Sequence, residues 1–201
     1  MKSSAIATTL CLLILPVAGS AAGFEDEIVR SHNAYRAKHS APALRWNASV
    51  AAVAQEWADT NARENKMYHR PNNKYGENIY WMSGGKVSGT MAVDAWYNEV
   101  GKYNFAKPGF SMQTGHFTQV VWKGSTEIGC GQARDAKGGT YIVCNYNPPG
   151  NYTGRFPQNV TQGRYAPSAV TQGPLRLRSR TEMAGGTYPL RHRSPHGVLR
   201  G

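Results

Sequence analysis

Two serines that could supply a catalytic nucleophile, Ser111 and Ser125, lie on either side of His116 in the sequence. A serine hydrolase of the α/β type presents its nucleophile in a Gly-x-Ser-x-Gly turn, and a helical zinc protease carries His-Glu-x-x-His. Neither pattern occurs in the chain. We therefore expect a binding protein and not an enzyme, with a metal-dependent hydrolase as the alternative.

Thiol chemistry is not expected either. The chain has three cysteines, and Cys11 lies in the apolar N-terminal stretch, which leaves Cys130 and Cys144. In an oxidising compartment these two would form a disulfide, which removes the thiolate that a cysteine nucleophile needs. Two buried free thiols are the alternative.

Three aromatic residues follow the spacing φ-x-φ-x-x-x-x-φ, in which φ is aromatic: Tyr103, Phe105 and Phe110. Pro108 and Gly109 favour an irregular loop at this point. Aromatic rings in a loop offer a flat apolar surface to a ring-shaped ligand, worth about 1.5–3 kcal/mol for each ring that is fully covered. Packing into the protein core is the alternative for the same spacing.

Three helices and three strands are predicted to position these residues. Apolar residues at intervals of three and four predict helices at about 24–38, 48–65 and 88–100. Short runs of β-branched and aromatic residues predict strands at 117–122, 127–133 and 140–146, the last two joined as a hairpin around Gly138. Helices first and strands last indicate an α+β fold with one core over residues 23–162.

The N-terminus has the layout of a cleaved secretory signal. Lys2 precedes an apolar run from Ala5 to Val17, and small residues follow up to Gly23. The run is shorter than the roughly 20 residues that span a bilayer. We therefore expect residues 1–22 to be removed and the mature protein to be secreted and extracellular.

The charge of +11 is concentrated at the C-terminus. Residues 163–201 contain seven Arg and one Glu and few large apolar residues, so we expect a disordered tail. The sequence shows no basic stripe with interleaved aromatics on a folded face, and no nucleic-acid partner is predicted. The tail is interpreted as a solvated extension, with weak adhesion to anionic lipid or cell wall as the alternative.

Two segments resemble the signature motifs of the CAP superfamily, which groups cysteine-rich secretory proteins, insect venom antigen five and plant pathogenesis-related group one proteins. They run from Gly115 to Trp122 and from Tyr141 to Tyr152. Three further segments resemble other motifs of the superfamily in the right order: Ser31 to Arg36, Leu44 to Ala58, and Gly76 to Ile79. The resemblance implies a three-layer α-β-α sandwich with a small antiparallel sheet between helices.

The resemblance also implies a central cleft in which two histidines and two glutamates converge. The matching residues are His69, Glu77, Glu99 and His116. Neutral imidazole nitrogens suit zinc, and nearby carboxylates can orient the imidazoles or hold a water. We expect this cleft to be able to hold a divalent metal, zinc or magnesium.

The stretch from Tyr103 to Phe110, followed by the first signature, is similar to the fungal sterol-binding branch of CAP proteins. This implies a carrier of a sterol or fatty acid that acts in lipid export or in host or defence interactions, and we expect the secreted protein to be a monomer. Tyr103, Phe105 and Phe110 would contact the lipid. A precursor of a signalling peptide is the alternative, because plant relatives release a peptide from the segment that matches residues 148–157.

Three sequons predict glycosylation if the source is eukaryotic. Their acceptors are Asn47, Asn151 and Asn159. Asn47 has a competing role, because it stands where the cap of the second predicted helix is expected.

Overall fold

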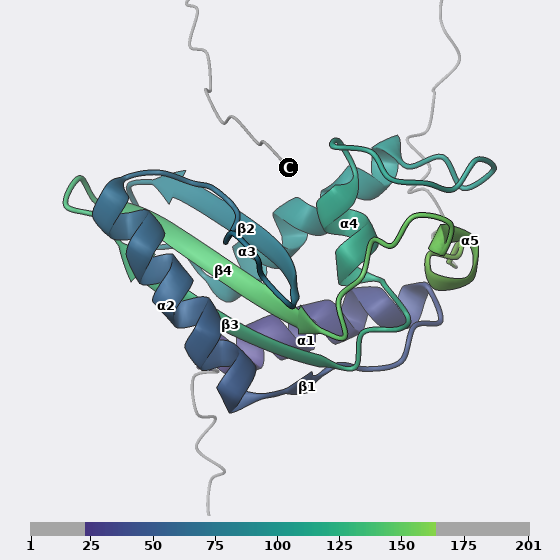
Figure 1. The fold of residues 1–201 in the computed structure, drawn as a ribbon, viewed down its shortest axis with the longest axis horizontal. Coiled ribbons are helices and arrows are strands. Elements are labelled where there is room, and N and C mark those ends of the chain that lie inside the picture. The colour runs from purple at the N-terminus through teal and green to yellow at the C-terminus, as the bar shows by residue number, and fades with distance from the viewer. Residues whose placement is uncertain (1–22, 164–201) are drawn as a thin grey trace, which may run out of the picture.

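The computed structural model describes residues 23–163, which form the sandwich shown in Figure 1. The predicted signal segment (residues 1–22) and all but the first residue of the predicted tail lie outside these residues. The elements in chain order are α1 (Phe24–Lys38), β1 (Arg45–Trp46), α2 (Ala48–Glu64), β2 (Gly76–Ser83), α3 (Gly89–Tyr97), the 3-10 helix η1 (Asn98–Lys102), α4 (Gly115–Val120), β3 (Glu127–Arg134), β4 (Gly139–Asn147) and α5 (Phe156–Asn159). No helix among residues 23–163 is long and apolar enough to cross a membrane.

A four-stranded sheet forms the middle layer, with the order β1-β3-β4-β2. β1 runs parallel to β3, and the other pairs are antiparallel. On one face α2 packs through Ala54, Trp57 and Ala58 against strand residues Ile79 and Val143. The larger core on the other face joins the sheet to α1, α3 and α4. The predicted α+β sandwich is thus confirmed.

The helix that covers the first face approaches the sheet closely. Gly129 and Gly131 of β3 face α2, and a Cβ atom at these positions would collide with the α2 backbone at Ala51 and Gln55, respectively. The Asn47 side chain accepts hydrogen bonds from two backbone N–H groups at the start of α2, which is the cap that the sequence predicts. This layer is therefore held rigidly against the sheet.

Most predicted elements are confirmed, and one is wrong. Predicted strands at 127–133 and 140–146 are β3 and β4, and the hairpin turns at Gly138 with φ +84°. The segment 117–122, predicted as a strand, is instead mostly α4. The prediction failed because a short run of apolar residues has the same pattern in a buried helix and in a buried strand. The third helix ends at Tyr97 and continues as η1, and strands β1 and β2 were not predicted.

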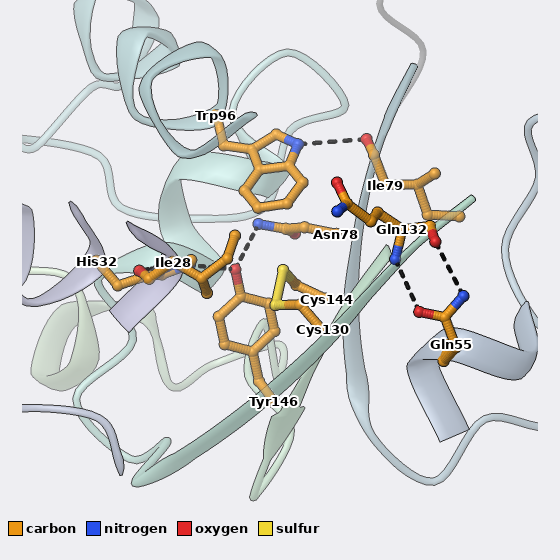
Figure 2. Close-up of a disulfide and its surroundings, with 10 residues drawn as sticks. All are labelled: Ile28, His32, Gln55, Asn78, Ile79, Trp96, Cys130, Gln132, Cys144 and Tyr146. Atoms are coloured by element: carbon orange, nitrogen blue, oxygen red, sulfur yellow. Dashed lines mark hydrogen bonds between the residues drawn. A yellow bond between two sulfur atoms is a disulfide. The ribbon is translucent and has the colours of Figure 1, made fainter. Parts of the chain in front are cut away.

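The disulfide joins Cys130 and Cys144, which lie directly opposite each other on β3 and β4. Figure 2 shows it beside Tyr146. The Tyr146 hydroxyl forms a hydrogen bond with Nε2 of His32 at 2.8 Å and accepts another from the Asn78 amide at 3.1 Å. Burial lowers the pKa of His32 to about 3, so this imidazole is neutral and ties α1 to the sheet.

Candidate functional site

The buried half of the predicted cleft is built at the start of α4. Nδ1 of His116 lies 2.7 Å from Oε1 of Glu99, and Oε2 of Glu99 accepts hydrogen bonds from the backbone N–H groups of His116 and Phe117. Both side chains are nearly buried, at 5% and 9% exposure. The Glu99 carboxylate thus orients the imidazole and satisfies backbone donors that begin a helix.

The second pair repeats this arrangement nearer to solvent. Nδ1 of His69 lies 2.8 Å from Oε1 of Glu77, and the same oxygen accepts from the backbone N–H of Arg70 at 3.0 Å. The other oxygen of Glu77 accepts from the Asn73 amide. The His69 side chain is 54% exposed, while Glu77 is 5% exposed. A buried carboxylate therefore holds an imidazole that faces water.

Both imidazoles line one small cleft of about 60 Å³. Its lining consists of His69, Glu77, Asn78, Phe110, Met112, Gly115, His116 and Asn151. Glu99 lies behind His116 and not in the lining, so three of the four predicted residues reach the cleft. An Nδ1 that donates to a carboxylate leaves Nε2 of a neutral imidazole as the free ligand atom.

A metal would find two imidazole ligands in this cleft. Zinc sites in proteins use three or four protein ligands. Among residues 23–163 no group of three or more His, Cys, Asp and Glu side chains is placed to hold a metal ion. The donor set therefore fits an exchangeable site completed by water or by a ligand, and not a permanent structural site.

Sequence reasoning missed Asn151 as a cleft residue and treated it as a sequon only. Its amide donates to the carbonyl of Gly115 at 2.9 Å, and its oxygen accepts from the Thr118 hydroxyl at 2.6 Å. Asn151 also has a left-handed backbone with φ +60°. These bonds attach the second signature to α4. The position of Asn151 inside that signature was the available signal.

The three aromatics predicted to contact lipid do not form one surface, which corrects the expected aromatic strip. Tyr103 is only 9% exposed and packs on Phe105 and Phe117 with ring centroids 4.9 and 5.4 Å apart. Phe105 is half-buried and stacks on His39. Burial raises the pKa of the Tyr103 phenol. The physical reason is that residues 103–105 complete the core against α4.

Phe110 behaves differently, because it is 56% exposed. It lines the imidazole cleft and also lines a larger cavity of about 380 Å³. We call this second space the loop cavity. Its lining is Pro108, Gly109, Phe110, Thr153, Gly154, Phe156 and Pro157.

The segment predicted as a releasable peptide, residues 148–157, forms the other wall of the loop cavity. The Ser125 hydroxyl donates to the carbonyl of Pro148, and the N–H of Gly150 donates to the side chain of Gln119. The segment is therefore part of the folded site. Its release stays a prediction, which mass spectrometry for a fragment that begins at Pro148 would test.

The three predicted glycosylation acceptors are all partly buried and bonded. Asn47 caps α2, Asn151 holds α4, and the Asn159 amide donates to the carbonyl of Arg155. Glycosylation of these residues stays a prediction.

Comparison with known families agrees with the fold and with the motif order. The family model described as CAP, cysteine-rich secretory protein family, matches residues 29–146. The chain belongs to the CAP family. That match includes both His–Glu pairs and the disulfide, while the second wall of the loop cavity follows it in sequence.

Two relatives show how widely this CAP domain occurs. The yeast Saccharomyces cerevisiae protein PRY2 is 42% identical over 139 residues, which cover 68% of this chain and 41% of PRY2. The human Golgi-associated plant pathogenesis-related protein 1 is 37% identical over 142 residues, covering 68% of this chain and 92% of the human protein. The CAP protein described here therefore has a fungal relative, of which it spans less than half the length.

Solved structures agree on the fold. The structure of NaASP2 with Zn²⁺ superposes with a TM-score of 0.55 and 21% identity, covering 74% of this chain and 90% of the other. At that identity the likeness establishes the sandwich alone. The zinc ion belongs to that protein.

Proposed function

We propose that this CAP protein is an exported, monomeric carrier of a sterol or a related small lipid, which it holds in the loop cavity. The observation that carries the proposal is Phe110, an exposed aromatic ring beside a cavity of about 380 Å³. Small-molecule sites occupy roughly 300–1,000 Å³ and are lined mainly by apolar groups. The resemblance of the stretch from Tyr103 to Phe110 to sterol-binding fungal CAP proteins supports the same ligand class. Lipid export or a host or defence interaction is the corresponding biological role.

The lining of the loop cavity suits an apolar, ring-shaped guest. Phe110 supplies exposed aromatic surface, Phe156 is a buried ring of the lining, and Pro108 and Pro157 supply rigid aliphatic surface on opposite walls. No charged side chain belongs to this lining. A guest that covers the Phe110 ring removes apolar surface from water, which contributes about 1.5–3 kcal/mol.

Tyr103 and Phe105 belong to the core that precedes the loop to Phe110. Their rings pack against Phe117 of α4, so they fix the base from which the loop to Phe110 departs. Because Tyr103 is buried, we assign it a positioning role and reserve direct lipid contact for Phe110. Phe105 is half-buried and belongs to the support.

The imidazole cleft adjoins the loop cavity through Phe110, which lines both. We assign Nε2 of His69 and Nε2 of His116 as the atoms that would hold a divalent metal, with zinc preferred to magnesium because imidazole is a nitrogen ligand. Bound there, the ion would act as a Lewis acid and attract a polar group of the guest. Glu77 and Glu99 orient the two rings.

The test compares lipid retention by two variants with single alanine substitutions at exposed apolar residues. Phe110→Ala should weaken equilibrium retention of labelled cholesterol or ergosterol at least about tenfold, because it removes an aromatic wall of the loop cavity. Met91→Ala is the matched control, since Met91 is also exposed but lies on α3 outside that lining. Equal retention by wild type and Phe110→Ala, with both folded by circular dichroism, would refute the placement.

A further inference from the structure

The exposed apolar side chains are unevenly distributed. Among residues 23–163 the exposed large hydrophobic residues are Trp81, Met91, Phe110, Met112 and Tyr152. Three of them lie around the two cavities, and we call Phe110, Met112 and Tyr152 the apolar rim. Phe110 and Met112 line the imidazole cleft. Tyr152 lies in the sequence between Asn151, which lines the imidazole cleft, and Thr153, which lines the loop cavity. Single exposed apolar residues are ordinary, but a cluster around a cavity mouth indicates a contact surface.

The loops that carry the apolar rim are positively charged. Residues 100–126 contain no Asp or Glu but include Lys102, Lys107 and Lys123, and Arg155 is the one charged residue between 148 and 163. Lys107 and Arg155 are exposed and flank the rim in sequence on both loops. The carboxylates of the two His–Glu pairs, Glu77 and Glu99, are buried and pair with imidazoles. The two loops thus combine exposed apolar side chains with exposed cationic ones.

The opposite end of the molecule lacks this pattern. Figure 1 shows the β3–β4 hairpin on the side away from α5 and the loops that carry the rim. That hairpin carries charges of both signs within four residues, at Arg134, Asp135 and Lys137. It therefore offers no extended field of one sign.

We propose that the apolar rim docks on the surface of an anionic lipid bilayer, so that a sterol or lipid passes between the membrane and the loop cavity. This inference rests on the proposed lipid-carrier function. Tyrosine and other amphipathic side chains favour the membrane–water interface, and each Lys or Arg near an anionic surface adds attraction that salt screens. An anionic bilayer matches both the apolar rim and the cationic side chains of its loops, whereas a neutral protein partner would match only the apolar rim. The contact is peripheral and brings the cavity mouth to the lipid.

The first test measures co-sedimentation of the full mature chain with vesicles of phosphatidylcholine, with and without 30 mol% phosphatidylserine. Wild type should bind the anionic vesicles, and Lys107→Glu/Arg155→Glu should bind at least about tenfold more weakly. Lys86→Glu/Lys137→Glu is the matched control, because it makes the same charge change at exposed residues outside the two rim loops and keeps the Arg-rich tail. Equal losses in the two variants, equal binding by all three proteins, or no vesicle binding by wild type would overturn the proposal.

The second test asks whether the rim itself enters the interface. An environment-sensitive nitrobenzoxadiazole label is attached at Tyr152→Cys and, as control, at Lys137→Cys on the hairpin. Anionic vesicles should raise and blue-shift the emission of the label at position 152, while the label at 137 should stay unchanged. An unchanged label at 152, or the same response at both positions, would contradict the assigned docking face.

Failure of docking and failure of lipid carriage give different results. Neither Lys107, Arg155 nor Tyr152 lines the loop cavity, so their variants should retain pre-loaded sterol in solution as wild type does. Their uptake of sterol from vesicles should be several-fold slower. Normal retention without vesicle binding by wild type would overturn docking alone. Vesicle binding without any retained lipid would overturn the carrier function.

Discussion

The predicted site divides into a buried half and an exposed half, although sequence motifs present their residues as equals. Tyr103 is 9% exposed and Phe110 is 56% exposed, seven residues apart in the same stretch. The two imidazoles divide in the same way, with side chains 5% exposed at His116 and 54% exposed at His69. The buried half packs at the core around α4, although His116 still reaches the imidazole cleft, and the exposed half faces solvent at the cavities. The comparison teaches that each pair has one member anchored in the core around α4 and one member exposed to solvent.

The largest expected effect is a loss of stability in acid that comes from the buried His32. The pKa of His32 is about 3 in the folded chain because burial disfavours imidazolium, whereas the ordinary value is 6.5. Below pH 6.5 the unfolded chain therefore takes up a proton that the folded chain does not. The free energy of unfolding should fall between pH 6.5 and 3 by on the order of 4 kcal/mol from this group.

Urea denaturation at a series of pH values checks that effect. His32→Gln should flatten the fall, because it removes the buried imidazole. An identical pH dependence in wild type and His32→Gln would show that His32 is not kept neutral by burial. Burial also lowers the pKa of His39, so a smaller fall should persist in the His32 variant.

Replacing Tyr103 or Phe110 with alanine should affect the free energy of unfolding very unequally. Tyr103→Ala leaves a cavity in the core and should lower the free energy of unfolding by about 3 kcal/mol. Phe110→Ala removes an exposed ring and should change it by less than about 0.5 kcal/mol. Chemical denaturation of both variants checks the difference, and equal losses would mean that Phe110 is part of the core.

The two glutamates should differ by a smaller amount. Glu99→Gln weakens bonds to the His116 ring and to two backbone N–H groups at the start of α4, and we expect a loss of about 2 kcal/mol in stability. Glu77→Gln weakens a pair whose histidine is half exposed, and we expect about 1 kcal/mol. A larger loss in Glu77→Gln would reverse the assignment of the buried half as the structural one.

Zinc binding should require both halves. We expect His116→Ala and His69→Ala each to weaken zinc affinity at least about tenfold, because each removes one of two imidazole ligands. Calorimetric titration of zinc into the folded variants measures this. Wild-type affinity in either single variant would exclude that histidine as a ligand.

The sequence predicted the helical layers well because their patterns are local. The helix predicted at 24–38 is α1 at Phe24–Lys38, and Asn47 caps α2 as expected from its type and position. The run at 117–122 was misassigned because tertiary contacts decide its structure: the Glu99 carboxylate binds the first N–H groups of α4 from 17 and 18 residues away. No local pattern contains that information.

The sequence identified most residues of the candidate site but could not show which of their side chains are exposed. Motif matching identified both His–Glu pairs, which the fold brings to one cleft region. The aromatic spacing could not show that Tyr103 completes the core while Phe110 projects, because an irregular loop has no fixed period. Met112 stood in no motif, and its place at the cleft mouth follows from the path of the same loop.

Native mass spectrometry of the mature protein, secreted by a eukaryotic host and purified without detergent, tests lipid carriage most directly. We predict a species heavier by the mass of one sterol or small lipid, present in wild type and in Met91→Ala but lost in Phe110→Ala. A wild-type spectrum that holds only the bare chain, even after incubation with cholesterol or ergosterol, would contradict the account.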